Sequence, residues 1–494
     1  MGNPEQESQA ANDPFSLTGL TYDDVLLLPG DTDVIPSEAS TASRLTKEIE
    51  LNIPLVSAAM DTVTESRMAI AMARIGGLGI IHRNLSAEDQ ANQVDYVKRS
   101  ESGMINDPLT ITPDKTLEEL DEICGKCRIS GLPVVDENNV LVGIVTNRDL
   151  RFVTRSEFPT RTVAETMTKM PLVTAPVGVA AEKAFELLAE HKVEKLPLVD
   201  DNNVIQGLIT VKDFVKTEEY PLATKDDEGR LRVGAAVGFY GDAYERAGML
   251  AEAGADVLVV DTAHGHQVKM LDTLSAIADA ELGVPIVAGN VVTAEGVRDL
   301  VSAGADIVKV GVGPGAMCTT RMMTAVGRPQ FSAVLECAEA ARELGAHVWA
   351  DGGVRYPRDV ALALAAGASQ VMVGSWFAGT HESPGDLLID GEGRKYKESF
   401  GMASARAVAN RTRTESAFAR ARKGLFEEGI SSSTMYIDPE SPGVEDLLDG
   451  ITSGVRSSCT YAGAGSLGEF ARLAAVGVQS AAGYEEGRPL SGSW

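Results

Sequence analysis

Eight short apolar runs separated by helical stretches constrain the fold of this chain more than any other feature. Runs of this kind are typical of parallel strands that are buried on both faces of a sheet. They cover residues 51–60, 77–82, 233–237, 257–261, 285–288, 307–310, 347–350 and 370–374. The helical stretches cover 65–75, 244–253, 268–279, 294–303, 332–344 and 357–366. Eight βα units predict an α/β fold, a (β/α)8 TIM barrel, with another domain inserted after the second unit.

An internal repeat fills the interruption, between about residues 101 and 219. The run 132–149 aligns with 196–213 at a constant offset of 64 residues, and each copy is typical of a hairpin that leads into a helix. The repeat resembles a tandem pair of CBS modules, an α+β domain known for binding adenine or guanine nucleotides. The resemblance implies that Thr146 with Asp149, and Thr210 with Asp213, hold the ribose of a regulatory nucleotide. The alternative is that both aspartates only cap the helix that follows.

Composition limits the classes of function. A net charge of −27 argues against binding to nucleic acid or to an anionic membrane surface, and no apolar window is long enough to span a membrane. Residues 1–15 are polar, so we expect a disordered leader on a cytoplasmic protein. Five scattered cysteines fit a reducing compartment better than a disulfide framework. We expect residues 20–30 to form a short helical turn that ends at Pro29-Gly30.

The predicted domains follow from these patterns. After the leader, residues 16–100 form the first part of the barrel, residues 101–219 the inserted pair of modules, and residues 220–494 the second part of the barrel. The second part is expected to contain a mobile flap at about 410–450 and a C-terminal tail.

Polar and glycine-rich segments follow the barrel strands, where the catalytic residues of such barrels lie. Cys318 lies in Gly311–Arg321, a loop where glycines allow close approach to a ligand and a thiolate can act as nucleophile. The alternative is a small buried thiol in a turn. The loops that begin at Asp351, Gly374 and Gly401 offer backbone amides for a phosphate and a carboxylate for a ribose. The ligand is therefore predicted to be a nucleoside monophosphate.

Several motifs together resemble the IMP dehydrogenase/GMP reductase family. They are MDTVT at 60–64, DTAHGH at 261–266, AGNVVT at 288–293, the Cys318 loop, DGG at 351–353 and GS-x-x-AGT at 374–380. The resemblance covers nearly the whole chain after Leu20. It implies that Cys318 forms a thioimidate with C2 of a purine and that the enzyme uses a nicotinamide cofactor. It also implies a role in purine nucleotide salvage and assembly as a homotetramer or homo-octamer.

The resemblance also implies the roles of individual residues. Cys318 is the nucleophile, Thr320 takes part in the proton relay, and Glu428 is the catalytic acid, with Glu427 as the alternative. The substrate, GMP or IMP, is expected to contact Ser57, Asp351, Gly352, Gly353, Gly374, Ser375, Gly401, Met402 and Ser404. The cofactor is expected to contact Asp261, Thr262, Ala263, Asn290, Gly311, Val312 and Gly313, with Ser457 and Tyr461 from a neighbouring subunit. Potassium is expected on the carbonyls of Gly313, Gly315 and Cys318. Ala316 stands where the family generally has serine, so one hydroxyl contact to the phosphate is not expected.

The last hundred residues favour the reductive branch of the family. Dehydrogenases of the family carry an arginine in the flap that activates water, whereas residues 431–438 of this chain contain Tyr436 and no arginine. The run Arg456–Ala464 resembles the reductases, as does 331–337, whereas DTAHGH and the CBS pair are typical of the dehydrogenases. We therefore expect NADPH-dependent conversion of GMP to IMP and ammonia. The alternatives are an IMP dehydrogenase with an atypical flap and a non-catalytic nucleotide sensor, while the choice between NADPH and NADH stays open.

Overall fold

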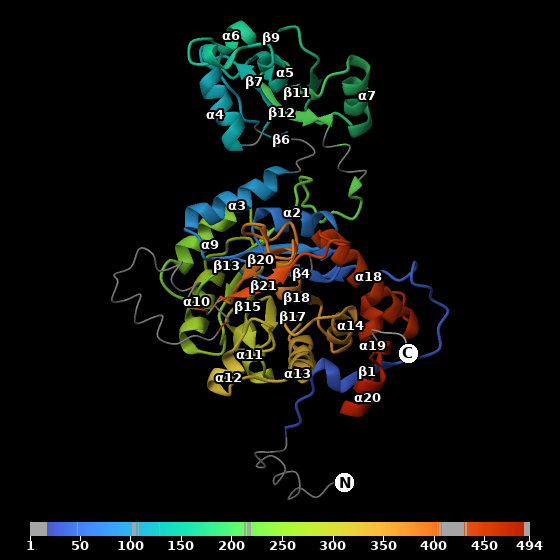
Figure 1. Ribbon diagram of the computed structural model, residues 1–494. Helices are drawn as coiled ribbons and strands as arrows, with labels where there is room; N and C mark the ends of the chain where they lie inside the picture. Colours follow the sequence, from blue (N-terminus) through green and yellow to red (C-terminus); the bar gives the residue numbers. More distant parts are fainter. Residues whose placement is uncertain are drawn as a thin grey trace, which may run out of the picture. The chain divides into compact units, whose positions relative to one another are not determined.

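The computed structural model describes residues 17–488, apart from 47, 101–104, 107, 128, 212–213, 215–218, 403, 405–406, 408–428 and 430–431. The chain separates into two compact units, one formed by 1–98, 222–224 and 231–494, and one by 99–221 and 225–230. Figure 1 shows the ribbon of both units.

A closed barrel of eight parallel strands forms the larger unit and confirms the predicted fold class (Figure 1). In spatial order the strands are β13 (Gly234–Val237), β14 (Val257–Asp261), β15 (Ile286–Val291), β16 (Ile307–Val310), β17 (His347–Asp351), β18 (Gln370–Val373), β4 (Leu55–Ser57) and β5 (Leu78–Ile81). Every predicted strand occurs, since each is a continuous apolar run that the sheet buries on both faces. Their carboxyl ends therefore meet at one rim.

Successive side chains along a barrel strand pack into two different hydrophobic clusters, because neighbouring residues of a strand point to opposite faces of the sheet. In β14, Val257 and Val259 belong to a cluster that contains Trp349, while Leu258 and Val260 pack into the cluster that includes the helices. The helices that follow the strands are α2 (Ser66–Arg74), α3 (Ala87–Ser100), α9 (Ala243–Glu252), α10 (Val268–Ala278), α11 (Ala294–Ser302), α13 (Gln330–Glu343) and α14 (Pro357–Ala365). A filled interior leaves the rim as the place for a ligand.

The N-terminal segment of the barrel unit differs from the prediction. Residues 20–30 form a 3-10 turn, η1 (Tyr22–Asp24), which continues as strand β1 (Val25–Leu28) instead of ending at Pro29-Gly30. Strand β1 pairs antiparallel with β22 (Ala475–Val478), close to the short helix α20 (Ala481–Glu486). A partner some 450 residues away in the sequence supplies the hydrogen bonds that convert an apolar turn into a strand.

Two further elements follow the barrel. A small antiparallel sheet consists of β19 (Leu388–Ile389), β20 (Lys395–Ser399) and β21 (Ser433–Tyr436). The long helix α18 (Val444–Tyr461) packs against α14 and is followed by α19 (Leu467–Leu473). Of the flap expected at 410–450, residues 410–428 and 430–431 lie outside the described residues, and the rest forms β21 and the start of α18.

The smaller unit contains the two copies of the repeat. The first copy forms the hairpin β7 (Gly131–Val135) with β8 (Leu141–Thr146), and the second forms β11 (Lys195–Val199) with β12 (Ile205–Thr210). The two turns pair with each other symmetrically, because Leu141 N–H donates to Asn203 O at 2.9 Å and Ile205 N–H to Asn139 O at 3.1 Å. Asn139 and Asn203 both have positive φ, 61° and 59°. Equivalent residues of the repeat thus form equivalent structure.

The remaining elements of this unit complete both copies. They are β6 (Ile105–Asn106), α4 (Leu117–Cys127), α5 (Asn147–Leu150), η2 (Arg155–Glu157), α6 (Val163–Thr166), β9 (Thr168–Lys169), β10 (Ala175–Pro176) and α7 (Ala181–His191). Each copy has its own apolar cluster, around Leu132 in the first and Leu196 in the second.

Candidate active site

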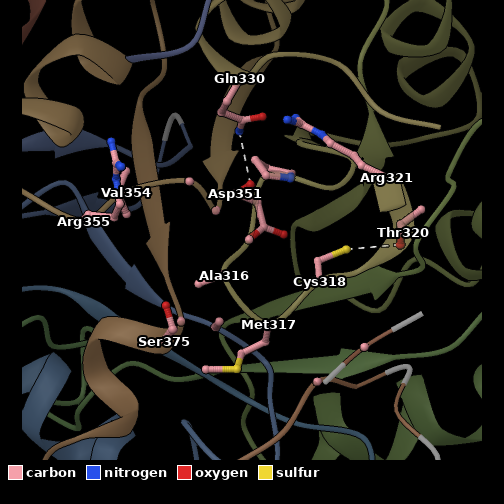
Figure 2. A pocket seen from close by; sticks show the side chains of 18 of the residues that line it. Ala316, Met317, Cys318, Thr320, Arg321, Gln330, Asp351, Val354, Arg355 and Ser375 are labelled. Carbon is pink, nitrogen blue, oxygen red and sulfur yellow. Dashed lines mark hydrogen bonds between the residues drawn. The ribbon is translucent and has the colours of Figure 1, made fainter. Parts of the chain in front are cut away.

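A cavity of about 450 Å³ opens at the rim of the barrel (Figure 2). Loops that follow five strands, β4, β14, β16, β17 and β18, contribute to its wall. Residues 21–23 of the N-terminal segment, Gly401 with Met402, and Gly429 complete the wall. Segments far apart in the sequence therefore meet where a barrel places its chemistry.

Cys318 lies in the wall of this cavity, in the loop between β16 and the short helix α12 (Thr320–Thr324). Its N–H donates to Gly315 O at 3.0 Å, and its thiol lies 3.1 Å from Thr320 Oγ1 as hydrogen-bond donor (Figure 2). Gly313 has φ of 77°, and a Cβ at this position would lie 2.5 Å from Cγ of Arg321. The loop therefore requires glycine and holds a thiol beside a hydroxyl that can exchange a proton with it.

The flap returns to the thiol loop at Gly429. This glycine forms an isolated antiparallel bridge with Cys318 and lines the cavity. Glu427 and Glu428, the alternatives for the catalytic acid, precede Gly429 in the sequence and lie outside the described residues.

A buried lysine at the end of β16 binds two aspartates of the rim. Lys309 Nζ lies 2.8 Å from Asp261 Oδ1 and 2.6 Å from Asp351 Oδ2, and Asn290 Nδ2 donates to the same Asp351 oxygen at 2.9 Å. Burial alone would lower the pKa of Lys309, but the two carboxylates outweigh it and raise the pKa. Burial alone would raise the pKa of Asp261, but Lys309 lowers it overall. Asp261 is therefore held ionised, and both aspartates accept hydrogen bonds at the rim.

Lys309 was not predicted as a residue of the site, although the sequence contains an indication of its role. It is a lysine inside an otherwise apolar strand, Ile-Val-Lys-Val, and its side chain is 4% exposed. A cation in such a run requires a buried anion, and two other strands of the predicted barrel end in, or are followed by, an aspartate, Asp261 and Asp351.

The loops predicted to bind the nucleotide line the opposite part of the cavity. Asp351 ends β17 and is followed by Gly352 and Gly353, while Gly374 precedes the short helix α15 (Ser375–Ala378), which begins at Ser375. Gly352 and Gly353 have φ of 84° and 83°, a region that favours glycine. Gly401 and Met402 join them.

Gln330, the first residue of α13, joins the thiol loop to the nucleotide loop and was not predicted. Its side chain is 3% exposed, and Nε2 donates to Val310 O at 2.9 Å and to Asp351 O at 3.2 Å (Figure 2). These carbonyls belong to the last residues of β16 and β17. One amide therefore sets the spacing between the loop that carries Cys318 and the loop that follows Asp351.

Two serines predicted to contact the substrate are placed differently. Ser57 is fully buried, its Oγ accepts a hydrogen bond from the Thr64 hydroxyl at 2.8 Å, and Ala58 and Met60 of the same loop line the cavity instead. Ser404 is also buried, and its Oγ accepts from Ala407 N–H at 3.2 Å. Both hydroxyls therefore hold neighbouring chain segments.

The residues predicted for the cofactor divide into two groups. Ala263 lines the cavity, and Asp261, Thr262, Asn290, Gly311, Val312 and Gly313 belong to the same rim. Asn290 N–H donates to Thr262 O at 2.8 Å, and Asn290 Nδ2 donates to Gly311 O at 2.6 Å. Ser457 and Tyr461 lie in α18, outside the cavity wall, and Tyr461 is 64% exposed.

The flap tyrosine does have an arginine partner, which the sequence did not reveal. Tyr436 in β21 lies under the guanidinium of Arg394, whose carbon is 4.4 Å from the ring centroid, and its hydroxyl lies 3.1 Å from Asp390 Oδ2. Arg394 Nη2 lies 3.0 Å from the same hydroxyl. Tyr436 and Arg394 are exposed, and neither lines the cavity.

The residues predicted to bind a regulatory nucleotide are in part occupied locally. Thr146 N–H and the Thr146 hydroxyl both donate to Asp149 Oδ2, at 2.7 and 2.8 Å, and cap helix α5. Thr210 ends β12, and Asp213 lies outside the described residues. In the structure Asp149 therefore takes part in capping helix α5, as the alternative interpretation expects.

Within the described ranges, no three His, Cys, Asp or Glu side chains come together as a metal site. The potassium ligands predicted from Gly313, Gly315 and Cys318 would be carbonyl groups, and Gly315 O already accepts one hydrogen bond. None of the helices that the structure describes is long and apolar enough to cross a membrane.

Comparisons with known proteins agree on one family. The family model "IMP dehydrogenase / GMP reductase domain" matches residues 19–490. An inosine-5'-monophosphate dehydrogenase of Bifidobacterium longum is 50% identical over 96% of this chain and 90% of its own length. A GMP reductase of Mycobacterium bovis is 51% identical over 96% of this chain and 97% of its own length. A crystal structure of a cysteine-to-alanine variant of GMP reductase from Trypanosoma brucei with guanosine 5'-monophosphate is 37% identical, covers 98% of this chain and 100% of its own, and has a TM-score of 0.88.

Proposed function

This chain belongs to the IMP dehydrogenase/GMP reductase family, and we propose that within the family it is an NADPH-dependent GMP reductase. The family consists of oxidoreductases of purine nucleotide interconversion that use a nicotinamide cofactor. The relatives include both activities at about the same identity, so the choice depends on the residues of the site.

The surroundings of the flap tyrosine carry this proposal. A dehydrogenase must activate water to hydrolyse its covalent intermediate, and in the family a flap arginine does so. Here the arginine beside Tyr436 is Arg394, which is held by Asp390 on an exposed hairpin away from the cavity. A cation bound there cannot act on a water molecule at the Cys318 thioimidate. Among the residues that the structure describes, Arg394 is the one arginine that contacts Tyr436, and this supports the proposal that the intermediate is reduced rather than hydrolysed.

The proposed reaction begins at Cys318. The thiolate adds to C2 of GMP, the bond between C2 and the exocyclic nitrogen breaks, and ammonia leaves with a proton relayed through Thr320 and Glu428. The thiol-to-hydroxyl distance of 3.1 Å supports the relay, and we propose Glu428, with Glu427 as the alternative, as its other member. Bound NADPH would supply hydride to C2, after which the sulfur leaves and IMP is released.

The rim residues fit the binding of both molecules. The carboxylate group of Asp351 would accept hydrogen bonds from the ribose hydroxyls, while the amides of Gly353, Gly374 and Ser375 would face the phosphate. Asp261 and Ala263 would hold the nicotinamide ribose, together with the rim residues 290 and 311–313. Ser457 and Tyr461, outside the wall of this cavity, would contribute from a neighbouring subunit of a tetramer or octamer. Potassium on the carbonyls of the Cys318 loop would steady that loop.

We also infer that residues 101–219 are a tandem CBS pair through which purine nucleotides regulate the enzyme. The symmetric hairpins support this inference, as does a structure of the Trypanosoma brucei GMP reductase with guanosine 5'-triphosphate, 34% identical with a TM-score of 0.78. Thr146, Asp149, Thr210 and Asp213 would contact the ribose. If ATP and GTP change neither the rate nor the assembly state, the inference is wrong.

Purified protein mixed with GMP and NADPH tests the main proposal. We expect loss of the absorbance of reduced nicotinamide together with formation of IMP and ammonia. A dehydrogenase would instead leave NADPH untouched and form XMP from IMP and NAD, and this result would overturn the proposal.

A further inference from the structure

The charged residues that line the cavity are few. Among the described lining residues they are two arginines, Arg321 and Arg355, and two aspartates, Asp23 and Asp351. Their formal charges cancel, whereas a nucleoside monophosphate carries nearly two negative charges at its phosphate. Backbone amides share part of this charge, but a guanidinium is the side chain that best matches a phosphate. The wall therefore offers two candidate cations.

Arg321 is committed to the thiol loop. Its Nη2 donates to the carbonyl of Arg328, and its stem packs over Gly313 and Gly327, where an added Cβ would lie within 2.7 Å of it. Figure 2 shows Arg321 on the same side of the cavity as Thr320, away from Ser375. This arginine supports the loop that carries the nucleophile and does not face the nucleotide-binding amides.

Arg355 lies at the other end of the cavity. It comes two residues after Gly353, it is on the Ser375 side in Figure 2, and its side chain is 50% exposed. Its Nη2 donates to Asp23 Oδ1 at 2.6 Å, and its Nε lies 3.7 Å from Asp359 Oδ2. No described residue accepts from its Nη1, so this end of the guanidinium has donors to offer.

Asp23 holds Arg355 from the N-terminal segment. The same carboxylate oxygen also accepts from Arg358, one helical turn further along the chain, which does not line the cavity. The segment itself is fastened by the C-terminal strand, since Gln479 N–H donates to Asp24 O at 2.8 Å and Gln479 Nε2 to Asp23 O at 3.0 Å. The arginine is thus held in position before any ligand binds.

We propose that Arg355 binds the 5'-phosphate of the substrate and determines the preference for nucleotide over nucleoside, with Asp23 as its positioning residue. The proposal rests on the proposed function, because it requires a purine nucleotide in this cavity with its base near Cys318. It adds a side-chain cation to a phosphate site that is otherwise built from amides.

Arg355→Gln is the direct test, and Arg358→Gln is its matched control, because Arg358 shares Asp23 but lies outside the cavity wall. Calorimetry should compare GMP with guanosine and IMP with inosine. We expect Arg355→Gln to weaken binding of both nucleotides by about 10- to 100-fold and to leave both nucleosides within about 2-fold. Arg358→Gln should leave all four within about 3-fold, and Arg355→Lys should restore part of the loss.

In turnover, KM for the nucleotide should rise in Arg355→Gln while kcat stays within about 3-fold of the wild type. Asp23→Asn should raise KM less than Arg355→Gln, since it removes only the positioning contact. Equal losses for nucleotide and nucleoside would show a merely structural role, and unchanged nucleotide binding would refute the proposal. If the wild-type protein binds neither GMP nor IMP, the proposed function itself fails.

Discussion

Strand β14 carries an aspartate at each end, and the two are used in different ways. Asp256 immediately precedes the strand at the foot of the barrel, and Asp261 ends it at the rim. Asp256 Oδ2 accepts from Lys98 Nζ at 2.7 Å and from Val233 N–H at 2.8 Å, and Oδ1 accepts from Arg232 Nη1 at 3.2 Å. Its side chain is 8% exposed, so its capacity as an acceptor is spent inside the protein.

Asp261 is satisfied only in part. Lys309 is its single ion-pair partner in the described part of the chain, and this lysine is shared with Asp351. The Asp261 side chain is 25% exposed at the rim. Free acceptor positions on an ionised carboxylate suit a ligand with hydroxyl groups. In this barrel, the hydrogen-bond and ion-pair partners of an aspartate therefore decide whether it has a structural role or can bind a ligand.

The foot of β14 also has a definite structural task. Lys98 is the last residue of the barrel unit before the chain leaves it, and Arg232 follows directly on the return at Leu231. Lys98 Nζ also donates to Leu231 O at 3.2 Å. Asp256 therefore fastens the chain at two of the places where it passes between the units, after Lys98 and before Leu231, which is the stabilising role expected of a barrel foot.

The largest effect should come from the rim, in Cys318→Ala. We expect turnover to fall by about 10⁴-fold or more, because no covalent intermediate can form. Cys318 lies in a partly exposed loop, so the free energy of unfolding should change by less than about 0.5 kcal/mol. Steady-state rates and urea unfolding measure both, and nucleotide binding should persist. Appreciable residual turnover would contradict a thioimidate mechanism.

The matched pair Asp256→Asn and Asp261→Asn tests the comparison itself. Asp256→Asn should lower the free energy of unfolding by about 3 kcal/mol, because Lys98 stays buried without its anion, and should leave the turnover of folded enzyme unchanged. Asp261→Asn should lower kcat/KM by about 100-fold, mainly through KM for the cofactor, and the free energy of unfolding by less than about 1 kcal/mol.

Both variants need the two measurements side by side, urea unfolding and kinetics over a range of cofactor concentration. A large loss of stability in Asp261→Asn, or a loss of turnover in Asp256→Asn at a temperature where the protein is folded, would show that the two ends of β14 do not divide the work as proposed.

The barrel could be predicted because each of its strands can be recognised from its local sequence, as a continuous apolar run before a helix. Strand β1 could not, since its hydrogen bonds come from Val476 and neighbours at the far end of the chain. The Cys318 loop stood out by its glycines. The contact of Ser57 with the substrate stays a prediction, and its hydrogen bond with Thr64 is one that the sequence does not show.

Side chains that act through distant partners were the ones missed. Gln330 looks like any residue at the start of a helix, and Arg355 like any surface arginine, until folding brings the carbonyls of Val310 and Asp351 to the first and Asp23 to the second. No spacing motif records such contacts, because they join elements whose separation in sequence is arbitrary.

The smallest predicted effect concerns Lys397 and the pH dependence of stability. It tests whether the partners of a buried lysine decide its behaviour. Lys98 and Lys309 are buried with carboxylates, whereas Lys397, also 3% exposed, donates, among the described residues, to the carbonyls of His381, at 3.1 Å, and Ser383. Burial and then Arg67 lower its pKa from 10.5 to about 8, although Glu382 opposes the shift.

Because the folded pKa of Lys397 lies below the unfolded value, the unfolded chain binds the proton more tightly between these values, and the wild type should gain stability as pH rises from about 8 to about 10. The gain should be on the order of 1–3 kcal/mol in urea unfolding. Lys397→Met should abolish this gain, whereas Lys395→Met, at an exposed position of the same strand, should keep it. An identical pH dependence in all three proteins would mean that Lys397 is not a buried cation without a carboxylate, and that partners do not decide the behaviour of the buried lysines.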